Sequence, residues 1–312
     1  MILSGILTCG DGTRLSLPPL SAWELTRTDG EPCGAFSLRF PADGKTAAQL
    51  GKAERFAGFC GGKTVFTGVV DECEVRLDGG GLRAGVFGRD RTALLMDREC
   101  RAVEFESAQL EDILSGFVRP QGISKISAGD FPAVPAFAVR TGESCWRVLC
   151  GFCRHSAGVQ PRFAADGTLI LRKDGGKALA LTEKNGPSEL RWHRSRCDEI
   201  AEQTIVDLTR RTAESVKNPA GGTRHEVAVR SGRTLKADWH TAAQRIGESR
   251  RDSERLELTL PYGFAAEPGD RISAALPHPG IAGRFRTVSA STRCDGGGLR
   301  TRLALRPDRE RE

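Results

Sequence analysis

The chain has 312 residues, of which 39% are hydrophobic, and its 46 Lys and Arg against 40 Asp and Glu give a formal net charge of +6 at pH 7. At about 150 residues per domain this length suggests two or three globular domains, and the composition excludes a largely disordered chain. The longest apolar runs fall far below the ~18 residues of a membrane span, and the first residues lack the basic segment of a signal peptide, so we expect no membrane partner and no secretion.

Residues 1–98 are predicted to form a β-domain. Apolar and polar residues alternate in several short segments, and Asp-Gly or Gly-Gly pairs separate them. Such pairs supply the positive φ angles that tight hairpins need. The segments with strand character are 15–17, 35–40, 63–70, 74–77 and 82–87.

Residues 99–187 have the pattern of a small α+β unit. Ser107 is placed to cap a helix whose apolar residues follow at i, i+3, i+4 and i+7, and Gly122 lies where that helix would end. A second amphipathic helix is predicted over about 144–156, followed by a hairpin over 162–171.

Residues 188–312 return to a β pattern, with a polar, Arg-rich insertion at about 209–254. Strict alternation, which is typical of half-buried antiparallel strands, is clearest in the segments 256–260 and 299–305.

One motif occurs twice in the chain. The sequence Asp-Gly-Gly-Gly-Leu-Arg begins at Asp78 and again at Asp295, each time between two strand-like segments, and the second strand of each pair ends in Arg-Asp or Arg-Pro-Asp. The motif could be a convenient hairpin turn that the chain uses twice. The matching flanks favour a duplicated β-domain, separated by the α+β unit. Three such chains would present six similar domains.

Several motifs, in the same order, resemble the baseplate hub proteins of contractile phage tails, the Mu-like and late-control-D-like hubs of phages, prophages and phage-tail-like bacteriocins. The resemblance rests on Thr64-Val-Phe-Thr-Gly-Val-Val70, on Val86-Phe-Gly-Arg-Asp-Arg-Thr-Ala-Leu-Leu-Met-Asp97, on the helix pattern of 110–123 and on the C-terminal block 260–305.

This resemblance implies a mainly β fold with an α+β insert. Two tandem tail-tube-like β-barrel domains, 1–98 and 188–312, would flank a small α+β, LysM-like domain at 99–187, and residues 209–254 would be a further domain inserted in the second barrel. It also implies a structural protein without enzymatic activity. Its place would be the virion tail baseplate, assembled in the cytoplasm of the host bacterium.

The partners implied by the resemblance are other tail proteins. A homotrimeric ring would join the trimeric central spike to the hexameric tail tube or tube initiator and contact further baseplate proteins. Because no β-helix repeats follow residue 306, we expect the spike to be a separate chain.

A metal site is the main chemical alternative. The spacing of Cys145, Cys150 and Cys153, with Cys197 as a fourth thiolate, matches part of an iron–sulfur pattern, and His155 would offer a zinc ligand. Against both, the segment is predicted to be a regular helix, which cannot wrap around a metal. We therefore expect reduced, buried cysteines that act as small hydrophobic residues, and no cofactor.

Two binding functions remain as further alternatives. Residues 139–149 are similar to the start of a LysM repeat, which would make 139–172 a peptidoglycan-binding module. The 14 Lys and Arg against 10 Asp and Glu in 191–255 allow nucleic-acid binding, but the scarcity of aromatic residues there favours a polar protein contact. No motif of a catalytic triad, a metalloprotease or a phosphate-binding loop is present, so we assign no catalytic residues.

Overall fold

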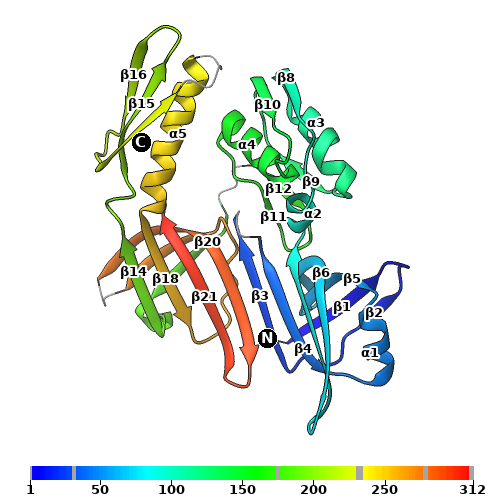
Figure 1. The fold of residues 1–312 in the computed structure, drawn as a ribbon. Helices are drawn as coiled ribbons and strands as arrows, with labels where there is room; N and C mark the ends of the chain where they lie inside the picture. The colour runs from blue at the N-terminus through cyan, green and yellow to red at the C-terminus, as the bar shows by residue number, and fades with distance from the viewer. Residues whose placement is uncertain (1, 30–32, 173–175, 230–234, 277–279, 309–312) are drawn as a thin grey trace. The chain divides into compact units, whose positions relative to one another are not determined.

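The computed structural model describes residues 2–29, 33–172, 176–229, 235–276 and 280–308. The chain divides into two compact units. Unit 1 comprises Met1–Gly176, Thr259–Gly269 and Val288–Leu303, and unit 2 comprises Lys177–Leu258, Asp270–Thr287 and Ala304–Glu312. Strands dominate both units (Figure 1), which confirms the prediction of a mainly β fold.

Unit 1 begins with a set of antiparallel strands. The hydrogen-bonded order is β20-β3-β4-β7-β6-β5-β1-β2. The elements are β1 (Leu3–Cys9), β2 (Arg14–Ser16), β3 (Ala22–Thr28), β4 (Ala35–Pro41), α1 (Gly44–Leu50), β5 (Ala53–Cys60), β6 (Lys63–Asp78) and β7 (Gly81–Asp90), together with the parts of β20 (Ile281–Asp295) and β21 (Gly298–Pro307) that belong to this unit.

Alternation places one side of these strands in a hydrophobic core. In β4 every second residue is buried, so Phe36, Leu38 and Phe40 all face inward. Phe36 lies with its ring centroid 4.5 Å from that of Phe56 in β5. Helix α1, capped by Asp43 through the backbone N–H of Thr46, contributes the buried Leu50.

The same unit holds a second, separate core built around helix α4 (Cys145–Ala157), with Trp146, Leu149 and Phe152 fully buried. The helix begins at its N-cap Ser144 and ends at Gly158, which has φ 60°, in agreement with the predicted helix at 144–156. The other elements here are α2 (Ala93–Met96), β8 (Val103–Ala108), α3 (Leu110–Ile113), η1 (Leu114–Val118), η2 (Arg119–Gln121), β9 (Ile126–Ala128), β10 (Val134–Val139), β11 (Arg162–Phe163) and β12 (Leu169–Leu171).

The start of α3 differs from the prediction that Ser107 caps this helix. Ser107 lies in β8, where it pairs with Pro135 of β10, and Gln109 is the cap. Gln109 and Asp112 form a reciprocal capping box, in which the Gln109 backbone N–H donates to Asp112 Oδ2 at 2.8 Å. Strand pairing extends β8 beyond Ser107, so the helix begins later. The helical segment that α3, η1 and η2 form together ends at Gly122 (φ 77°), as expected.

Unit 2 contains a second strand set in the order β14-β18-β21-β20-β19-β13. Its elements are β13 (Ala178–Thr182), η3 (Glu183–Asn185), β14 (Glu189–Arg194), β18 (Glu254–Leu260) and β19 (Arg271–Leu276), with the remaining parts of β20 and β21. Among the described residues, the pairings of this set and of the set in unit 1 form open paths, and neither returns to its first strand.

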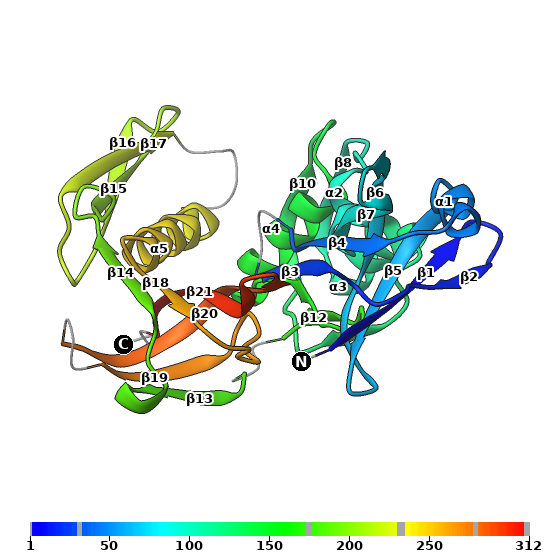
Figure 2. The same cartoon turned by 90° about the horizontal axis from the view of Figure 1, so that it is seen from below.

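The polar insertion is an ordered lobe. Strands β16 (Thr212–Lys217) and β17 (Arg224–Val229) pair with β15 (Ile200–Asp207), and helix α5 (Leu235–Asp252) covers one face of this sheet (Figure 2). Ile205 and Val216 of the sheet pack with Ala242 and Ile246 of α5. Residues 230–234 of the predicted insertion lie outside the described residues. None of the described helices combines the length and apolarity needed to cross a membrane.

Candidate assembly interface

The repeated motif forms the same turn in both copies. In the β6–β7 hairpin the Asp78 carboxylate accepts the backbone N–H of Gly80 at 2.8 Å. In the β20–β21 hairpin the Asp295 carboxylate accepts the backbone N–H of Gly297, also at 2.8 Å. This local contact is the reason why Asp begins both turns, since a short acceptor side chain satisfies the backbone donor two residues on.

The glycine and arginine of the motif are equivalent as well. Gly81 has φ 94° and Gly298 has φ 93°, a region that side chains other than glycine rarely adopt. Arg83 Nη2 lies 3.1 Å from an oxygen of Asp78, and Arg300 Nη2 lies 3.7 Å from an oxygen of Asp295.

The equivalence extends along the flanking strands. Residues 63–69 of β6 pair antiparallel with β5, and residues 281–286 of β20 pair antiparallel with β19. With the two turns superposed, these paired stretches occupy the same positions in their hairpins. β5 therefore corresponds to β19, β6 to β20 and β7 to β21.

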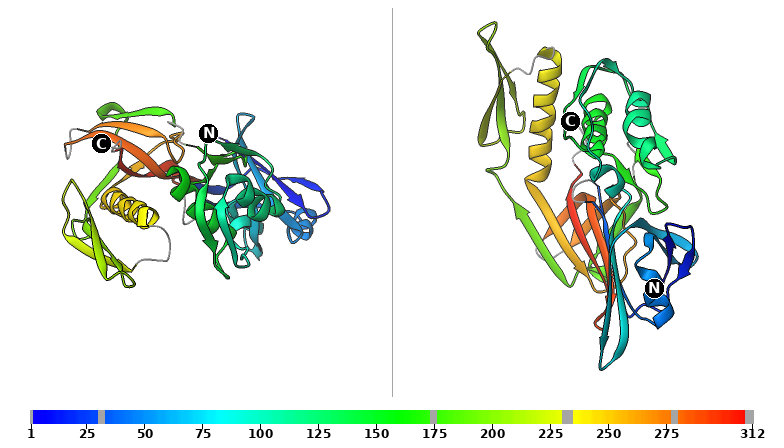
Figure 3. Two further views of the ribbon diagram at one scale, coloured as in Figure 1. Left: turned by 90° about the horizontal axis from the view of Figure 1, so that it is seen from above. Right: turned by 45° about the vertical axis from the view of Figure 1, so that its right-hand side comes forward.

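Beyond these stretches the two hairpins differ. Residues 289–294 of β20 continue into a second pairing, with Thr28–Trp23 of β3, and Ser291 Oγ donates to Glu24 Oε1 at 2.8 Å. The corresponding residues of β6, 72–77, pair with β7 on one side, and among the described residues no strand pairs with their other side. This part of the hairpin projects from its sheet (Figure 3).

A second strand edge corresponds to β3. β3 pairs with β4, which pairs with β7. In the second set β14 pairs with β18, which pairs with β21, so β14 takes the place of β3. In the part of the chain that the structure describes, β14 has one strand neighbour, β18, and ends the hydrogen-bonded path.

Both edges expose apolar side chains. Val75 and Leu77 of β6 are 45% and 76% exposed. They lie opposite Ala84 and Leu82 of β7, on the face of the sheet where Ala84 is buried. Trp192 of β14 is 50% exposed. At the corresponding place in the covered hairpin, Cys294 lies opposite Trp23, which is only 5% exposed.

The charges on the two edges are of opposite sign. Residues 72–77 of β6 carry two carboxylates and one arginine, whereas β14 carries two arginines, one histidine and one carboxylate. Complementary charge of this kind sets register and partner choice more than affinity.

The base of the exposed hairpin is held by Arg89. Its guanidinium makes two 2.8 Å hydrogen bonds to Asp71 in β6 and further bonds of 2.9 and 2.7 Å to Asp97 after α2. These hydrogen bonds raise the pKa of Arg89 and lower that of Asp97.

The residues beside Arg89 explain the Gly-Arg-Asp motif. A Cβ on Gly88 would collide with the carbonyl oxygen of Val69 and with the Phe36 ring. Asp90 is buried, accepts backbone N–H groups of Gly34 and Thr92 at 2.9 Å each, and has a pKa raised by its burial. The motif is therefore structural.

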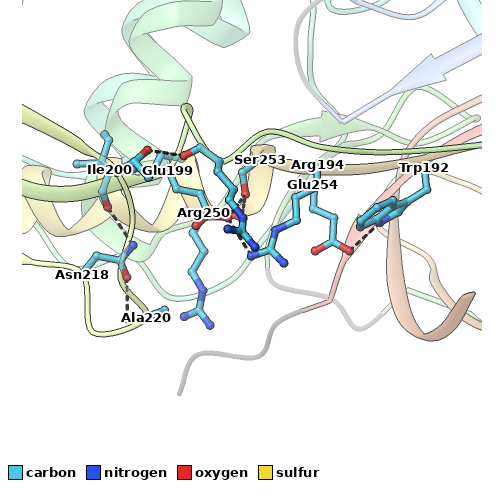
Figure 4. A network of polar contacts seen from close by, with 12 residues as sticks. Trp192, Arg194, Glu199, Ile200, Asn218, Ala220, Arg250, Ser253 and Glu254 are labelled. Carbon is cyan, nitrogen blue, oxygen red and sulfur yellow. Dashed lines mark hydrogen bonds and ion pairs between the residues drawn. The ribbon is translucent and has the colours of Figure 1, made fainter.

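The lobe of unit 2 is joined to its strands by a buried polar network (Figure 4). Glu199 Oε1 accepts from Ser253 Oγ at 3.0 Å and lies 3.5 Å from Arg194 Nη2 of β14. Asn218 donates to the carbonyl of Ile200 at 2.9 Å. These contacts lie where the chain leaves β14 and returns to β18, and they fix the lobe to the strand that carries the second edge.

Of the four candidate metal ligands, three are buried and one is exposed. Cys145, Cys150 and Cys153 lie in α4 within the second core of unit 1, whereas Cys197 is exposed in unit 2 beside Ser195, at 3.1 Å between Sγ and Oγ. Burial raises the pKa of Cys153. Within the described ranges, no three His, Cys, Asp or Glu residues gather into a group that could hold a metal ion. The metal set remains an alternative that rests on spacing alone, and the expectation that these cysteines bind no metal stays a prediction.

Sequence reasoning did not identify the residues of this candidate interface. Val75, Leu77 and Trp192 alternate as core residues do, and their exposure depends on a strand neighbour that the sequence does not specify. The repeat was the available signal, because it allows the uncovered hairpin to be compared with the covered one. Glu199 and Ser253 were also missed, since they are 54 residues apart and carry no motif.

Comparison with solved structures identifies the fold. The chain matches a tail protein of Neisseria meningitidis MC58 with a TM-score of 0.80 and 18% identity, over 99% of this chain and 97% of that one. It matches the 43 kDa tail protein of prophage MuSo2 from Shewanella oneidensis with a TM-score of 0.74 and 20% identity, over 97% and 96%. The E. coli c3393 protein, a component of the type VI secretion system with structural similarity to the phage T4 tail proteins gp27 and gp5, matches with a TM-score of 0.61 and 12% identity, over 93% and 74%.

No protein-family model and no curated protein sequence matches the chain. The likeness to solved structures extends over nearly the whole chain at low identity, so it establishes the fold. The expected resemblance to phage tail proteins is confirmed at that level: this chain has the fold of Mu-like phage tail proteins.

Proposed function

We propose that the chain is a non-enzymatic structural hub of a contractile-tail baseplate, and that three copies form a closed ring. The observation that carries this proposal is the pair of complementary edges. Residues 72–77 of β6 and strand β14 correspond to residues 289–294 of β20 and strand β3, which pair within one chain.

Repeating that pairing between chains generates the ring. Residues 72–77 of one copy would pair with β14 of the next, so that the joint inside each chain alternates with an equivalent joint between chains. A head-to-tail contact of this kind produces a closed ring when the rotation per copy closes. Each open strand set would then have a neighbour on both sides, which is how the two tube-like barrels of the expected domains 1–98 and 188–312 would be completed.

The ring accounts for an adaptor role. It has three identical chains but six similar strand sets, so one face can match a trimeric spike and the other a hexameric tube. The fold of the tail proteins from Neisseria and Shewanella and of the type VI component supports this placement in a tail baseplate. Spike, tube initiator and other baseplate proteins are the partners we infer, with assembly in the host cytoplasm.

Light scattering over a concentration series tests the ring. We expect a species of about 101 kDa, three times the chain mass of 33.7 kDa. Leu77→Lys and Trp192→Lys place a charge at either side of the joint and should each abolish that species.

Val227→Lys is the matched control, because Val227 is 72% exposed but lies in the lobe on β17. It should assemble as the wild type does. Edge variants that assemble as well as this control would contradict the proposed joint.

A further inference from the structure

Two buried cysteines of unit 1 have their sulfur atoms in contact. Cys100, after α2, is 6% exposed, and Cys145, the first residue of α4, is 3% exposed. Their Sγ atoms are 3.5 Å apart. This is about 1.5 Å longer than a disulfide bond.

The backbone holds both residues in place. Glu99 and Ser144 form an isolated antiparallel bridge. On one side of it the Cys100 N–H donates to the Glu143 carbonyl, and on the other the Cys145 N–H donates to the Arg98 carbonyl, each at 2.8 Å. Two hydrogen bonds therefore hold the segments together whether or not the sulfurs are bonded. Because side chains alternate along antiparallel strands, Cys100 and Cys145 point to the same face of this pair.

We propose that Cys100 and Cys145 form a disulfide bond when the folded chain meets a small-molecule disulfide such as oxidised glutathione. Two S–H bonds break and one S–S bond forms between the cysteines. The two electrons and two protons pass to oxidised glutathione, whose own S–S bond is cleaved to give two molecules of reduced glutathione.

The bond would stabilise the core around α4. The two cysteines are 45 residues apart, and the closed loop contains β8, α3, β9 and β10. Closing a loop of this length restricts the unfolded chain and so stabilises the folded one. Burial raises the pKa of Cys100 to about 12, so little thiolate is present at neutral pH and oxidation is slow.

The test uses the full-length chain. The reduced protein is incubated with oxidised glutathione, denatured without reductant, alkylated and weighed by mass spectrometry. We expect two of the ten thiols to escape alkylation, and a digest to yield a peptide pair joined through Cys100 and Cys145. The oxidised wild type should also melt several degrees above the reduced protein.

Cys145→Ala should leave every remaining thiol open to alkylation. Cys150→Ala, a buried position in the same helix, is the matched control and should still lose two. Ten alkylated thiols in the treated wild type, or a joined peptide pair that does not contain Cys100 and Cys145, would overturn the proposal. Peptide mapping of the wild type keeps this result decisive even where a variant fails to fold.

Discussion

The two hairpins that carry the repeated motif have the same turn but different surroundings. Near the tip of β20–β21, Cys294 and Leu299 pack against the first core of unit 1, because β3 lies alongside. Near the tip of β6–β7, the corresponding Leu77 is 76% exposed. A short motif can therefore determine the turn, while the neighbouring strand decides whether the residues beside it belong to a core or to an interface.

The largest expected difference is in the stability lost when Trp23 or Trp192 is replaced by alanine. Trp23 is 5% exposed in β3, so Trp23→Ala should lower the free energy of unfolding by about 3–5 kcal/mol. Trp192 is 50% exposed in β14, and Trp192→Ala should cost the monomer less than about 1 kcal/mol while weakening assembly. Urea unfolding below the assembly concentration measures both. Similar losses at the two positions would show that β14 is already covered within one chain.

A smaller difference in stability is expected between leucine variants of the two hairpins. Leu299→Ala removes a side chain that packs on the first core and should cost about 1–2 kcal/mol. Leu77→Ala should change monomer stability by less than about 0.5 kcal/mol, because the side chain is solvated there. Light scattering should show the opposite ranking, with only Leu77→Ala reducing the ring.

Local chemistry is the part of this fold that sequence reasoning predicts well. The turns at Asp78 and Asp295 and the helix begun by Ser144 depend on contacts within a few residues. The pairing of β20 with β3 does not, since the Thr26–Ser291 hydrogen bond joins residues 265 apart. Ser107 illustrates the same limit, because pairing with β10 kept it in a strand instead of at a helix cap.

The candidate site was harder to predict than the fold. Alternating apolar residues in β6 indicate a strand with one apolar face, but the pattern is the same whether that face meets a core, a second chain or water. Cys100 was overlooked because its contact with Cys145 depends on an antiparallel bridge between distant segments.

The glycines of the two turns should respond equally. Gly81→Ala and Gly298→Ala force a side chain into φ near 94° and 93°, at an expected cost of about 1–2 kcal/mol each. No atom lies within 4 Å of either added Cβ, so the cost is conformational at both sites. Thermal unfolding of the two variants checks this. A clearly larger loss at Gly298 would mean that the strand alongside β20 also constrains the turn.

The smallest expected effect is on the pKa of Asp295 in the second turn. The backbone N–H of Gly297 and, to a lesser extent, the Arg293 guanidinium lower the pKa of Asp295 below its usual 3.8. A carboxylate whose pKa is lower in the folded state stabilises that state above its unfolded pKa, and the contribution is lost as the pH falls through the folded pKa.

A carbon-detected NMR titration should therefore place the Asp295 midpoint below 3.8. In Gly297→Pro, which has no backbone N–H to donate, the midpoint should move up towards that value. A midpoint that is unchanged by this substitution would assign the shift to Arg293 instead. The carboxylate would then be held differently in the two turns, because Arg293 lies 2.7 Å from Asp295 whereas the corresponding Arg76 pairs with Glu74.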